Sequence, residues 1–240
     1  MKKTLIAIST LLFSVSCFAQ EPQVTSKTDT PQSTSAVTTS EPIEMDKQYI
    51  VLPTYPSPDK EVIEFFSFNC PSCFKFETEY HGSQAIAKNL PESIKFKRYH
   101  LIDFGPLAME LAQAWAVANV LDIQDKALDA LYFAVQRDHK IKTAEDIKAV
   151  FKTLGVDEQT YDKTKDNFLV KAFMAQQIDA IKEMKPTSIP TVVVNRKFYI
   201  NPQALDRTTD QAFINDYARV AAFLVNLDPN VNPDRKLNKK

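Results

Sequence analysis

The residues that point most directly to chemistry are two cysteines three positions apart, in the segment Cys70-Pro71-Ser72-Cys73. They stand where an apolar strand pattern gives way to a helix pattern, so the first thiol is expected at a helix N-terminus. Unpaired backbone N–H groups and the positive end of the helix dipole favour a thiolate there. Pro71 suits the first helical turn because its missing N–H would be unpaired anyway. We predict a redox-active pair, with Cys70 as the exposed nucleophile and Cys73 as the resolving thiol.

A C-x-x-C pair can also be a structural disulfide or half of a zinc site. Zinc would require two further thiolate or imidazole ligands at a suitable spacing, and the three histidines of the chain form no paired motif. The third cysteine, Cys17, lies in or at the edge of an export signal, which leaves Cys70 and Cys73 as the expected cysteines of the mature chain. We therefore predict redox chemistry with no metal and no cofactor beyond the disulfide itself.

Residues 1–19 have the layout of a secretory signal peptide, with a basic start, a short apolar stretch and small residues before Ala19. The apolar stretch is too short to cross a bilayer, so we expect a soluble protein exported to the bacterial periplasm, where disulfides persist. Two fates stay open for Cys17: removal with the signal peptide, or lipidation as an anchored mature N-terminus. Residues 20–46 are rich in Ser, Thr and Pro, which predicts a disordered linker.

The composition predicts a globular protein with a sizeable core. The chain has 240 residues, of which 44% are hydrophobic, and a net charge of −1. Its basic residues are scattered along the sequence, so nothing indicates the phosphate-tracking surface of a nucleic-acid binder. We expect no nucleic-acid partner.

The spacing of apolar residues divides the folded part into three segments. Residues 47–104 are predicted to form strands around a helix that follows Cys70, residues 105–185 to form amphipathic helices, and residues 186–228 to form a hairpin and a last helix, before a charged tail at 229–240. The expected strands are 48–52, 62–68, 94–101, 191–194 and 198–200, and the later helices are 107–121, 127–137, 144–154, 158–163, 167–184 and 210–227. This order predicts an α/β protein, a thioredoxin-like fold with an inserted all-helical domain.

A second feature of interest is the pair Ile189-Pro190. Alone, a proline that opens a strand is most simply an edge residue. Together with an upstream C-x-x-C pair, it predicts a cis-proline loop that faces the disulfide. The backbone of Ile189 would then be free to pair with an extended substrate segment and hold a substrate cysteine beside Cys70.

Glu64 is a carboxylate within an otherwise apolar strand. Either it faces solvent, or it is buried near the disulfide. In the second case desolvation raises its pKa unless a cation compensates, and it can relay protons to Cys73. Arg98 on the neighbouring predicted strand is a candidate partner, and Glu77, one turn beyond Cys73, is another nearby carboxylate.

From about residue 45 to residue 227 the chain resembles the DsbA family of bacterial thiol:disulfide interchange proteins. The resemblance is carried, in one collinear order, by residues 62–73, 98–100, 113–118, 189–190, 194–195 and 201–202. It implies a thioredoxin domain with an inserted helical domain, oxidation of reduced exported polypeptides, reoxidation by a DsbB-type membrane partner through quinone, and a peptide-binding groove beside the active site. We expect a monomer, because no folded N-terminal domain is predicted that would serve dimerisation.

Two positions depart from the enteric members of that family, which have His at the position of Ser72 and Lys at the position of Arg98. Ser72 can donate a hydrogen bond but carries no charge to stabilise the Cys70 thiolate. DsbA has a thiol pKa of about 3.5 and a potential of about −120 mV, against about 7 and about −270 mV for thioredoxin. We predict that Cys70 is acidic but has a higher pKa than the thiol of that DsbA. We also predict that the pair is oxidising but has a lower potential. Because an arginine does not shuttle protons as a lysine can, acid–base work falls on Glu64.

Three other functions stay open at this point. The chain could be an oxidase dedicated to one client, a reductase or isomerase of the same fold, or a peptide-binding chaperone without redox turnover. A redox titration separates the first two, and Cys70→Ser separates redox chemistry from peptide holding.

Overall fold

The computed structural model describes residues 41–230. The predicted signal peptide, Cys17, most of the predicted linker and the last ten residues of the tail lie outside the described residues. Ordered contacts begin within the last residues of the predicted linker, where the Glu44 N–H donates to Gln48 and Met45 forms a β-bridge with Tyr49. Within residues 41–230, no helix combines the length and the apolar character needed to cross a bilayer.

Five strands form one mixed sheet in the order β1-β5-β4-β2-β3. They are β1 (Tyr49–Val51), β2 (Glu61–Phe66), β3 (Lys95–His100), β4 (Thr191–Val194) and β5 (Phe198–Ile200). β2 is an interior strand, parallel to β3 and antiparallel to β4, and all six of its residues are buried. A strand covered on both faces explains the near-continuous apolar run in the sequence.

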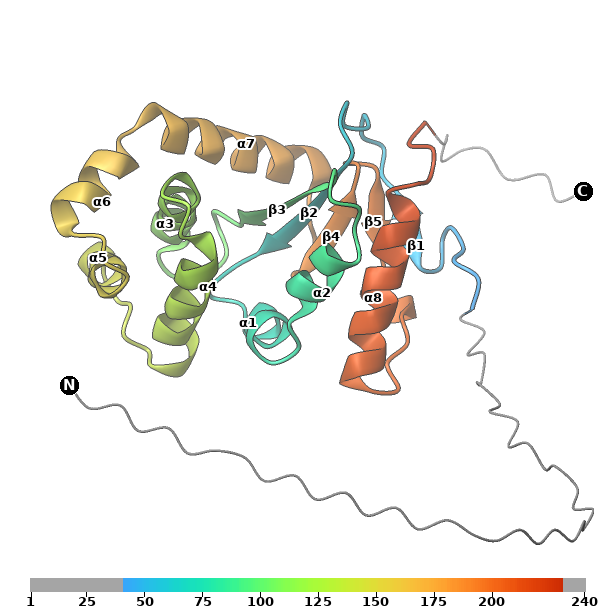
Figure 1. Cartoon of the computed structure of the whole chain (residues 1–240), viewed down its shortest axis with the longest axis horizontal. Helices are drawn as coiled ribbons and strands as arrows, with labels where there is room; N and C mark the ends of the chain where they lie inside the picture. The colour runs from blue at the N-terminus through green and yellow to red at the C-terminus, as the bar shows by residue number, and fades with distance from the viewer. Residues whose placement is uncertain (1–40, 231–240) are drawn as a thin grey trace, which may run out of the picture. The chain divides into compact units, whose positions relative to one another are not determined.

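Helices cover both faces of this sheet (Figure 1). On one face lie α1 (Pro71–Thr78), α2 (Gly82–Lys88) and α8 (Asp210–Leu224), where the rings of Phe76 and Tyr217 are 5.6 Å apart. On the other face, Ile63, Phe65 and Val193 pack against Ala180 and Met184 of α7 (Phe168–Met184). A short 3₁₀ helix, Pro202–Ala204, precedes α8.

A helical unit is inserted between β3 and β4 and gathers beyond the β3 edge of the sheet (Figure 1). Besides α7, it contains α3 (Ala108–Val120), α4 (Gln124–Tyr132), a π-helical turn (Phe133–Arg137), α5 (Ala144–Thr153) and α6 (Glu158–Lys165). Eight residues of α3 are buried, which makes it the central helix of the unit. Its Trp115 packs edge-on against Phe66 of β2, so the core of the insertion is continuous with the end of that strand. The α/β fold with a helical insertion is therefore confirmed.

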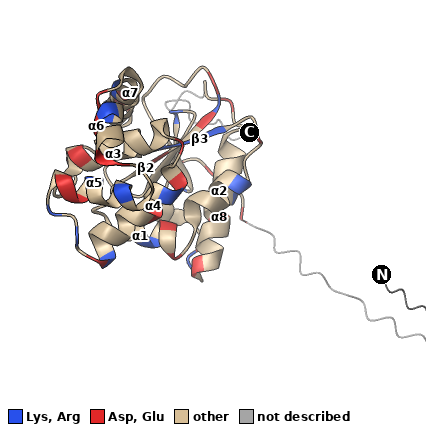
Figure 2. Ribbon diagram, turned by 60° about the vertical axis from the view of Figure 1, so that its left-hand side comes forward, with Lys and Arg blue, Asp and Glu red and all other residues tan. Residues whose placement is uncertain are grey.

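Acidic and basic residues are interspersed along the helices that Figure 2 brings forward. Ion pairs of opposite charge are common on this surface, as between Lys148 of α5 and Asp162 of α6 at 2.9 Å. Along these helices acidic and basic residues are therefore mixed, as their scattered sequence positions predicted.

Candidate active site

The two cysteines lie where β2 leads into α1. Cys70 is the N-cap residue of α1, Pro71 is its first residue, and the Cys70 Sγ accepts the Cys73 N–H at 3.2 Å. Both thiols are free in the structure. Cys73 is fully buried and Cys70 is 4% exposed, whereas Pro71 and Ser72 are exposed.

The prediction that Cys70 is an exposed thiol is therefore wrong for this reduced state. The loop before β4 covers it: the Cys70 thiol donates to the Ile189 carbonyl at 3.6 Å. The peptide bond between Ile189 and Pro190 is cis, and the Thr191 hydroxyl donates to the Ser188 carbonyl across the same turn. The structure thus brings Ile189 beside Cys70, as the sequence predicted.

The two thiols are in opposite electrostatic environments. The hydrogen bond from the Cys73 thiol, together with the Cys73 and Ser72 N–H groups, lowers the pKa of Cys70 to about 7 against the opposing effect of burial. Burial raises the pKa of Cys73 well above its ordinary value, and the hydrogen bond and charge of Cys70 add to that effect. Near neutral pH the pair therefore carries a partly ionised thiol at the helix N-terminus and a protonated thiol one turn inside.

The turn before Cys70 is held by polar side chains from distant parts of the chain. The Phe68 N–H donates to His100 Nε2 at 2.9 Å, and the Gln136 side chain donates to the Phe68 carbonyl at 2.7 Å. Gln177 in turn accepts the His100 N–H at 2.8 Å. Burial lowers the pKa of His100 to about 3, so this histidine stays neutral and serves as a hydrogen-bonding residue. The two glutamines were missed in the sequence, where nothing distinguishes them from other helical glutamines.

A second loop borders the cysteines on the side of Asn69. The Asn69 side chain donates to the carbonyls of Phe104 and Pro106 at 3.0 and 2.9 Å. Gly105 between them has a φ of +86°, and a Cβ there would lie 2.6 Å from the Asn69 Cβ. Only glycine both adopts this positive φ without strain and leaves room for the Asn69 side chain. The loop that carries the exposed Phe104 ring is thereby fixed beside the turn that precedes Cys70.

A buried charged cluster lies beneath α1, and it contains the three charged residues that the sequence grouped. Glu64 on β2 is 0% exposed, which excludes the solvent-facing alternative, and it stands in register with Arg98 on β3. Arg98 lies 3.3 Å from the Glu64 carboxylate and 3.7 Å from that of Glu77. Ser83 on α2, which the sequence did not single out, donates to Glu64 at 2.5 Å and also contacts Glu77.

Both carboxyl groups in this cluster resist ionisation. Burial raises the pKa of Glu64, against the lowering effects of the Arg98 charge and of the hydrogen bond from Ser83. Burial also raises the pKa of Glu77, and the Glu64 charge raises it further, to well above its ordinary value. The Glu64 charge in turn contributes to the high pKa of Cys73, so the cluster and the buried thiol are electrostatically linked.

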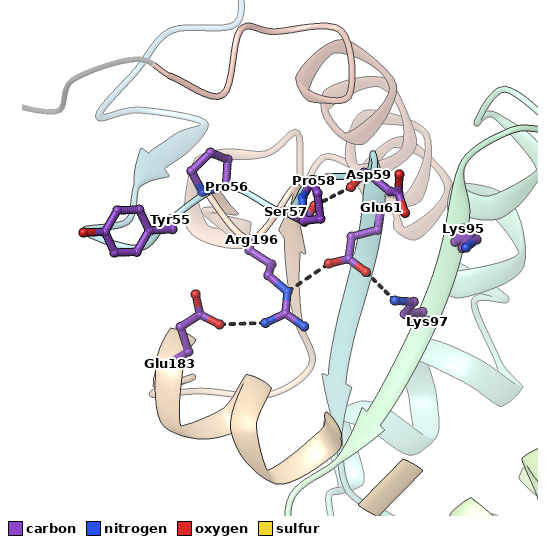
Figure 3. Close-up of a pocket in the computed structure, with 10 residues that line it drawn as sticks. All are labelled: Tyr55, Pro56, Ser57, Pro58, Asp59, Glu61, Lys95, Lys97, Glu183 and Arg196. Carbon is purple, nitrogen blue, oxygen red and sulfur yellow. Dashed lines mark hydrogen bonds and ion pairs between the residues drawn. The ribbon is translucent and has the colours of Figure 1, made fainter. Parts of the chain in front are cut away.

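A charged cavity of about 340 Å³ lies at the other end of β2 (Figure 3). It is lined by Glu61, the first residue of β2, whose carboxylate binds Lys97 at 2.6 Å and Arg196 at 3.0 Å. Arg196 also binds Glu183 at 2.6 Å. The charges in this cavity neutralise one another and none of its lining residues borders the cysteines, so it is not part of the dithiol site. Across residues 41–230, no three His, Cys, Asp or Glu side chains gather as metal ligands.

A mixed sheet of this order, with a dithiol at the helix that follows β2, defines the class of thioredoxin-fold proteins. A family model described as thioredoxin matches residues 56–216. DsbA of Salmonella typhimurium is 41% identical over 179 residues, which cover 75% of this chain and 86% of that protein. DsbA of Pectobacterium carotovorum is 38% identical over the same length. The chain belongs to the DsbA family of thiol:disulfide oxidoreductases.

Solved structures agree with this assignment. The crystal structure of DsbA from Klebsiella pneumoniae has a TM-score of 0.75 and 32% identity and covers 78% of this chain and 100% of its own. A Proteus mirabilis DsbA in complex with a non-covalently bound peptide has a TM-score of 0.74 and 30% identity and covers 77% of this chain and 99% of its own. The enzyme class is thus a protein-disulfide oxidoreductase.

Proposed function

We propose that this protein is a periplasmic dithiol oxidase that donates the Cys70–Cys73 disulfide to cysteines of exported polypeptides. A substrate thiolate attacks the Cys70 Sγ, the electron pair of the S–S bond leaves on Cys73, and a mixed disulfide forms. A second substrate thiolate then attacks the first substrate sulfur, and Cys70 leaves as a thiolate. The substrate loses two electrons and the protein is left in the dithiol form.

The observation that carries this proposal is the difference between the two thiols. A thiol with a pKa of about 7 is a good leaving group in the second step, which releases the oxidised substrate. Cys73 is fully buried, so attack is directed to Cys70. Because the pKa of Cys73 is high, its sulfur takes up a proton once it is released. Glu64, whose charge acts on Cys73, is the proposed proton donor, and Arg98 and Glu77 set its charge state.

The proposed substrate-binding element is the loop that contains Ile189 and Pro190. Its carbonyl at Ile189 lies 3.6 Å from the Cys70 sulfur, within reach of an N–H from an extended chain whose cysteine reacts there. The peptide-bound structure of the Proteus mirabilis relative supports binding of a peptide by this family. Reduced or unfolded exported polypeptides are the proposed clients.

Export and reoxidation follow from the N-terminal pattern and the family. Residues 1–19 are the proposed signal peptide, and mass spectrometry of the mature N-terminus tests both its cleavage and lipidation of Cys17. A DsbB-type membrane partner that passes electrons to quinone is the proposed reoxidant. Loss of oxidised protein in cells that lack such a partner is the expected result. The proposed monomeric state is tested by light scattering of the mature chain.

The decisive experiment is the redox potential of the Cys70–Cys73 pair, measured by equilibration with glutathione. We expect a value between about −120 mV, as in a DsbA, and about −270 mV, as in thioredoxin. A value at or below that of thioredoxin would overturn the oxidase proposal. Cys70→Ser is expected to abolish disulfide formation in a reduced client protein, whereas retained peptide binding with unchanged disulfide formation in cells would favour a chaperone.

A second candidate, a reductase or isomerase of the same fold, is favoured by one observation. The pKa of about 7 at Cys70 is the value found in thioredoxin, and Ser72 supplies no positive charge to lower it further. The redox titration of the Cys70–Cys73 pair separates an oxidase from a reductase. A reductase requires a low potential, because its dithiol form must be less stable than its disulfide form.

A further inference from the structure

The side chain of Ser83 is fully buried between two carboxyl groups that come from different elements. Its hydroxyl lies 2.5 Å from Glu64 Oε2, on β2, and forms a second hydrogen bond with Glu77 Oε1, on α1. The preceding residue makes this approach possible, because a Cβ at Gly82 would lie 2.4 Å from the Phe76 ring. A glycine at the start of α2 therefore lets this helix begin directly against α1, with the hydroxyl between the two acids.

The number of hydrogen atoms available limits how these groups can be protonated. A serine hydroxyl has one hydrogen to donate, so it can donate to one carboxylate only. Its second hydrogen bond to a carboxyl oxygen requires that the second carboxyl group donates its own proton to the Ser83 oxygen. The arrangement of Glu64, Ser83 and Glu77 is therefore satisfied when the two acids hold one proton between them.

The charges in the cluster agree with this count. Arg98 supplies one positive charge, 3.3 Å from Glu64 and 3.7 Å from Glu77. One ionised carboxylate balances it, whereas two would leave an uncompensated negative charge in a buried site. Burial and the Glu64 charge raise the pKa of Glu77 well above its ordinary range, whereas the Arg98 charge and the hydrogen bond from Ser83 lower that of Glu64 against the effect of burial, so Glu77 is the resting holder of the proton.

We propose that Ser83 is a positioning residue that bridges Glu77 and Glu64, so that the two acids share one proton and keep it available to Cys73. The inference rests on the proposed oxidase reaction. When a substrate thiolate attacks Cys70, the S–S bond breaks and its electron pair leaves on the Cys73 sulfur. A proton passes from Glu77 to Ser83 as the Ser83 proton passes to Glu64, and Glu64 gives one proton to Cys73. The acid pair loses one proton in total and recovers it from water.

Water can reach the cluster from the side of Arg98. This residue lines a cavity of about 370 Å³ together with Gln84 of α2 and Trp115 of α3, and its side chain is 12% exposed. The other titratable or charged groups that act on the cluster are Cys73 of α1, Asp129 and Tyr132 of α4, and Tyr217 of α8. Burial raises the pKa of both tyrosines, so they stay neutral near pH 7 and leave the proton count of the acids unchanged.

The test is a pH titration of the glutamate carboxyl carbons by carbon-13 NMR, on the reduced mature protein. Near neutral pH we expect the Glu64 and Glu77 pair to carry one proton. Ser83→Ala removes the hydrogen bond that stabilises the ionised carboxylate, so the lower of the two pair pKa values is expected to rise by about one unit. The pH profile of the rate at which dithiothreitol reduces the oxidised protein is expected to shift in the same direction. Thr78→Ala is the matched control, since it removes a hydroxyl of α1 that bonds to the Phe74 carbonyl and touches neither acid.

Several results would overturn the inference. One is a Ser83→Ala variant that titrates as the wild type does, or a Thr78→Ala variant that shifts as much. If Ser83→Ala does not fold, the proton count of the wild-type pair decides alone: zero or two protons near neutral pH contradicts the bridge. These outcomes are independent of the proposed function, which fails instead if the wild-type protein, titrating as expected, does not oxidise a reduced client.

Discussion

Replacing Ser72 by histidine is expected to make this protein a stronger oxidant. Ser72 is the exposed second residue of α1, and its backbone N–H already contributes to lowering the Cys70 pKa. An imidazolium within about 4–6 Å of a thiolate lowers its pKa by roughly one to three units. With a shift of two, the Cys70 pKa falls from about 7 to about 5.

The change in potential follows from linkage. Ionisation of Cys70 stabilises the dithiol form, at pH 7, by about 0.4 kcal/mol when the pKa is 7 and by about 2.7 kcal/mol when it is 5. The difference of about 2.3 kcal/mol corresponds to a rise of about 50 mV for this two-electron couple. The oxidised form has no Cys70 proton to lose, so it gains nothing, and the sign of the shift is towards a more oxidising protein.

Two measurements on Ser72→His test this reasoning. The ultraviolet absorbance of the thiolate against pH gives the Cys70 pKa, and equilibration with glutathione gives the potential. Ser72→Asn, polar but uncharged, is the matched control and is expected to change neither by much. A variant whose pKa falls by two units while its potential stays within about 10 mV of the wild type would refute the link between thiolate stability and oxidising strength.

Three further predictions concern stability. The unfolding free energy of the reduced protein in urea is expected to rise by about 2 kcal/mol from pH 7 to pH 9 relative to Cys70→Ser. The pKa of Cys70 is about 7 in the folded protein, below the ordinary thiol value of 9.0. Ionisation of Cys70 therefore adds its full contribution to the unfolding free energy above pH 9, and this contribution is lost as the pH falls through 7. His100→Phe leaves the buried Phe68 N–H without its acceptor and is expected to cost about 1–3 kcal/mol in the same assay; an unchanged urea midpoint would contradict this. Gly82→Ala is expected to cost about 1–3 kcal/mol because of the Phe76 ring, although alanine favours helices, and a more stable variant would show that the ring moves aside.

Local sequence patterns predicted most secondary-structure elements and failed where distant side chains intervene. The hairpin strands at 191–194 and 198–200 match the prediction residue for residue, because β-rich runs flank a turn. Strand β2 was expected to continue to Phe68 but ends at Phe66. The reason is that the Phe68 backbone forms hydrogen bonds with the side chains of His100 and Gln136 instead of a neighbouring strand. The helix expected at 127–137 begins at Gln124 and ends in a π-helical turn, a change of winding that the apolar spacing does not encode.

The site shows the same limit at the level of single residues. Glu64 and Arg98 were paired from sequence because each is a polar exception within an apolar strand, and parallel register brings them together. Ser83 gave no such signal, since a serine near a helix start is ordinary and its partners come from two other elements. The exposure predicted for Cys70 was wrong for a related reason: its sulfur contacts a carbonyl 119 positions further along the chain, which no local pattern reveals.

The contact between Cys70 and Ile189 also relates the redox state of the protein to its proposed substrate loop. When Cys70 of the reduced protein is protonated, its thiol donates to the Ile189 carbonyl at 3.6 Å. A disulfide sulfur has no hydrogen to donate, so the same carbonyl lacks this partner once Cys70 is oxidised. The oxidised protein then presents an acceptor to the N–H of an incoming chain, whereas in the reduced protein a bound product competes with the thiol for it. A hydrogen bond from sulfur at this distance is weak. Because it forms only after Cys70 is reduced, it favours binding of the substrate before the reaction and release of the product after it, which is the order that an oxidase requires.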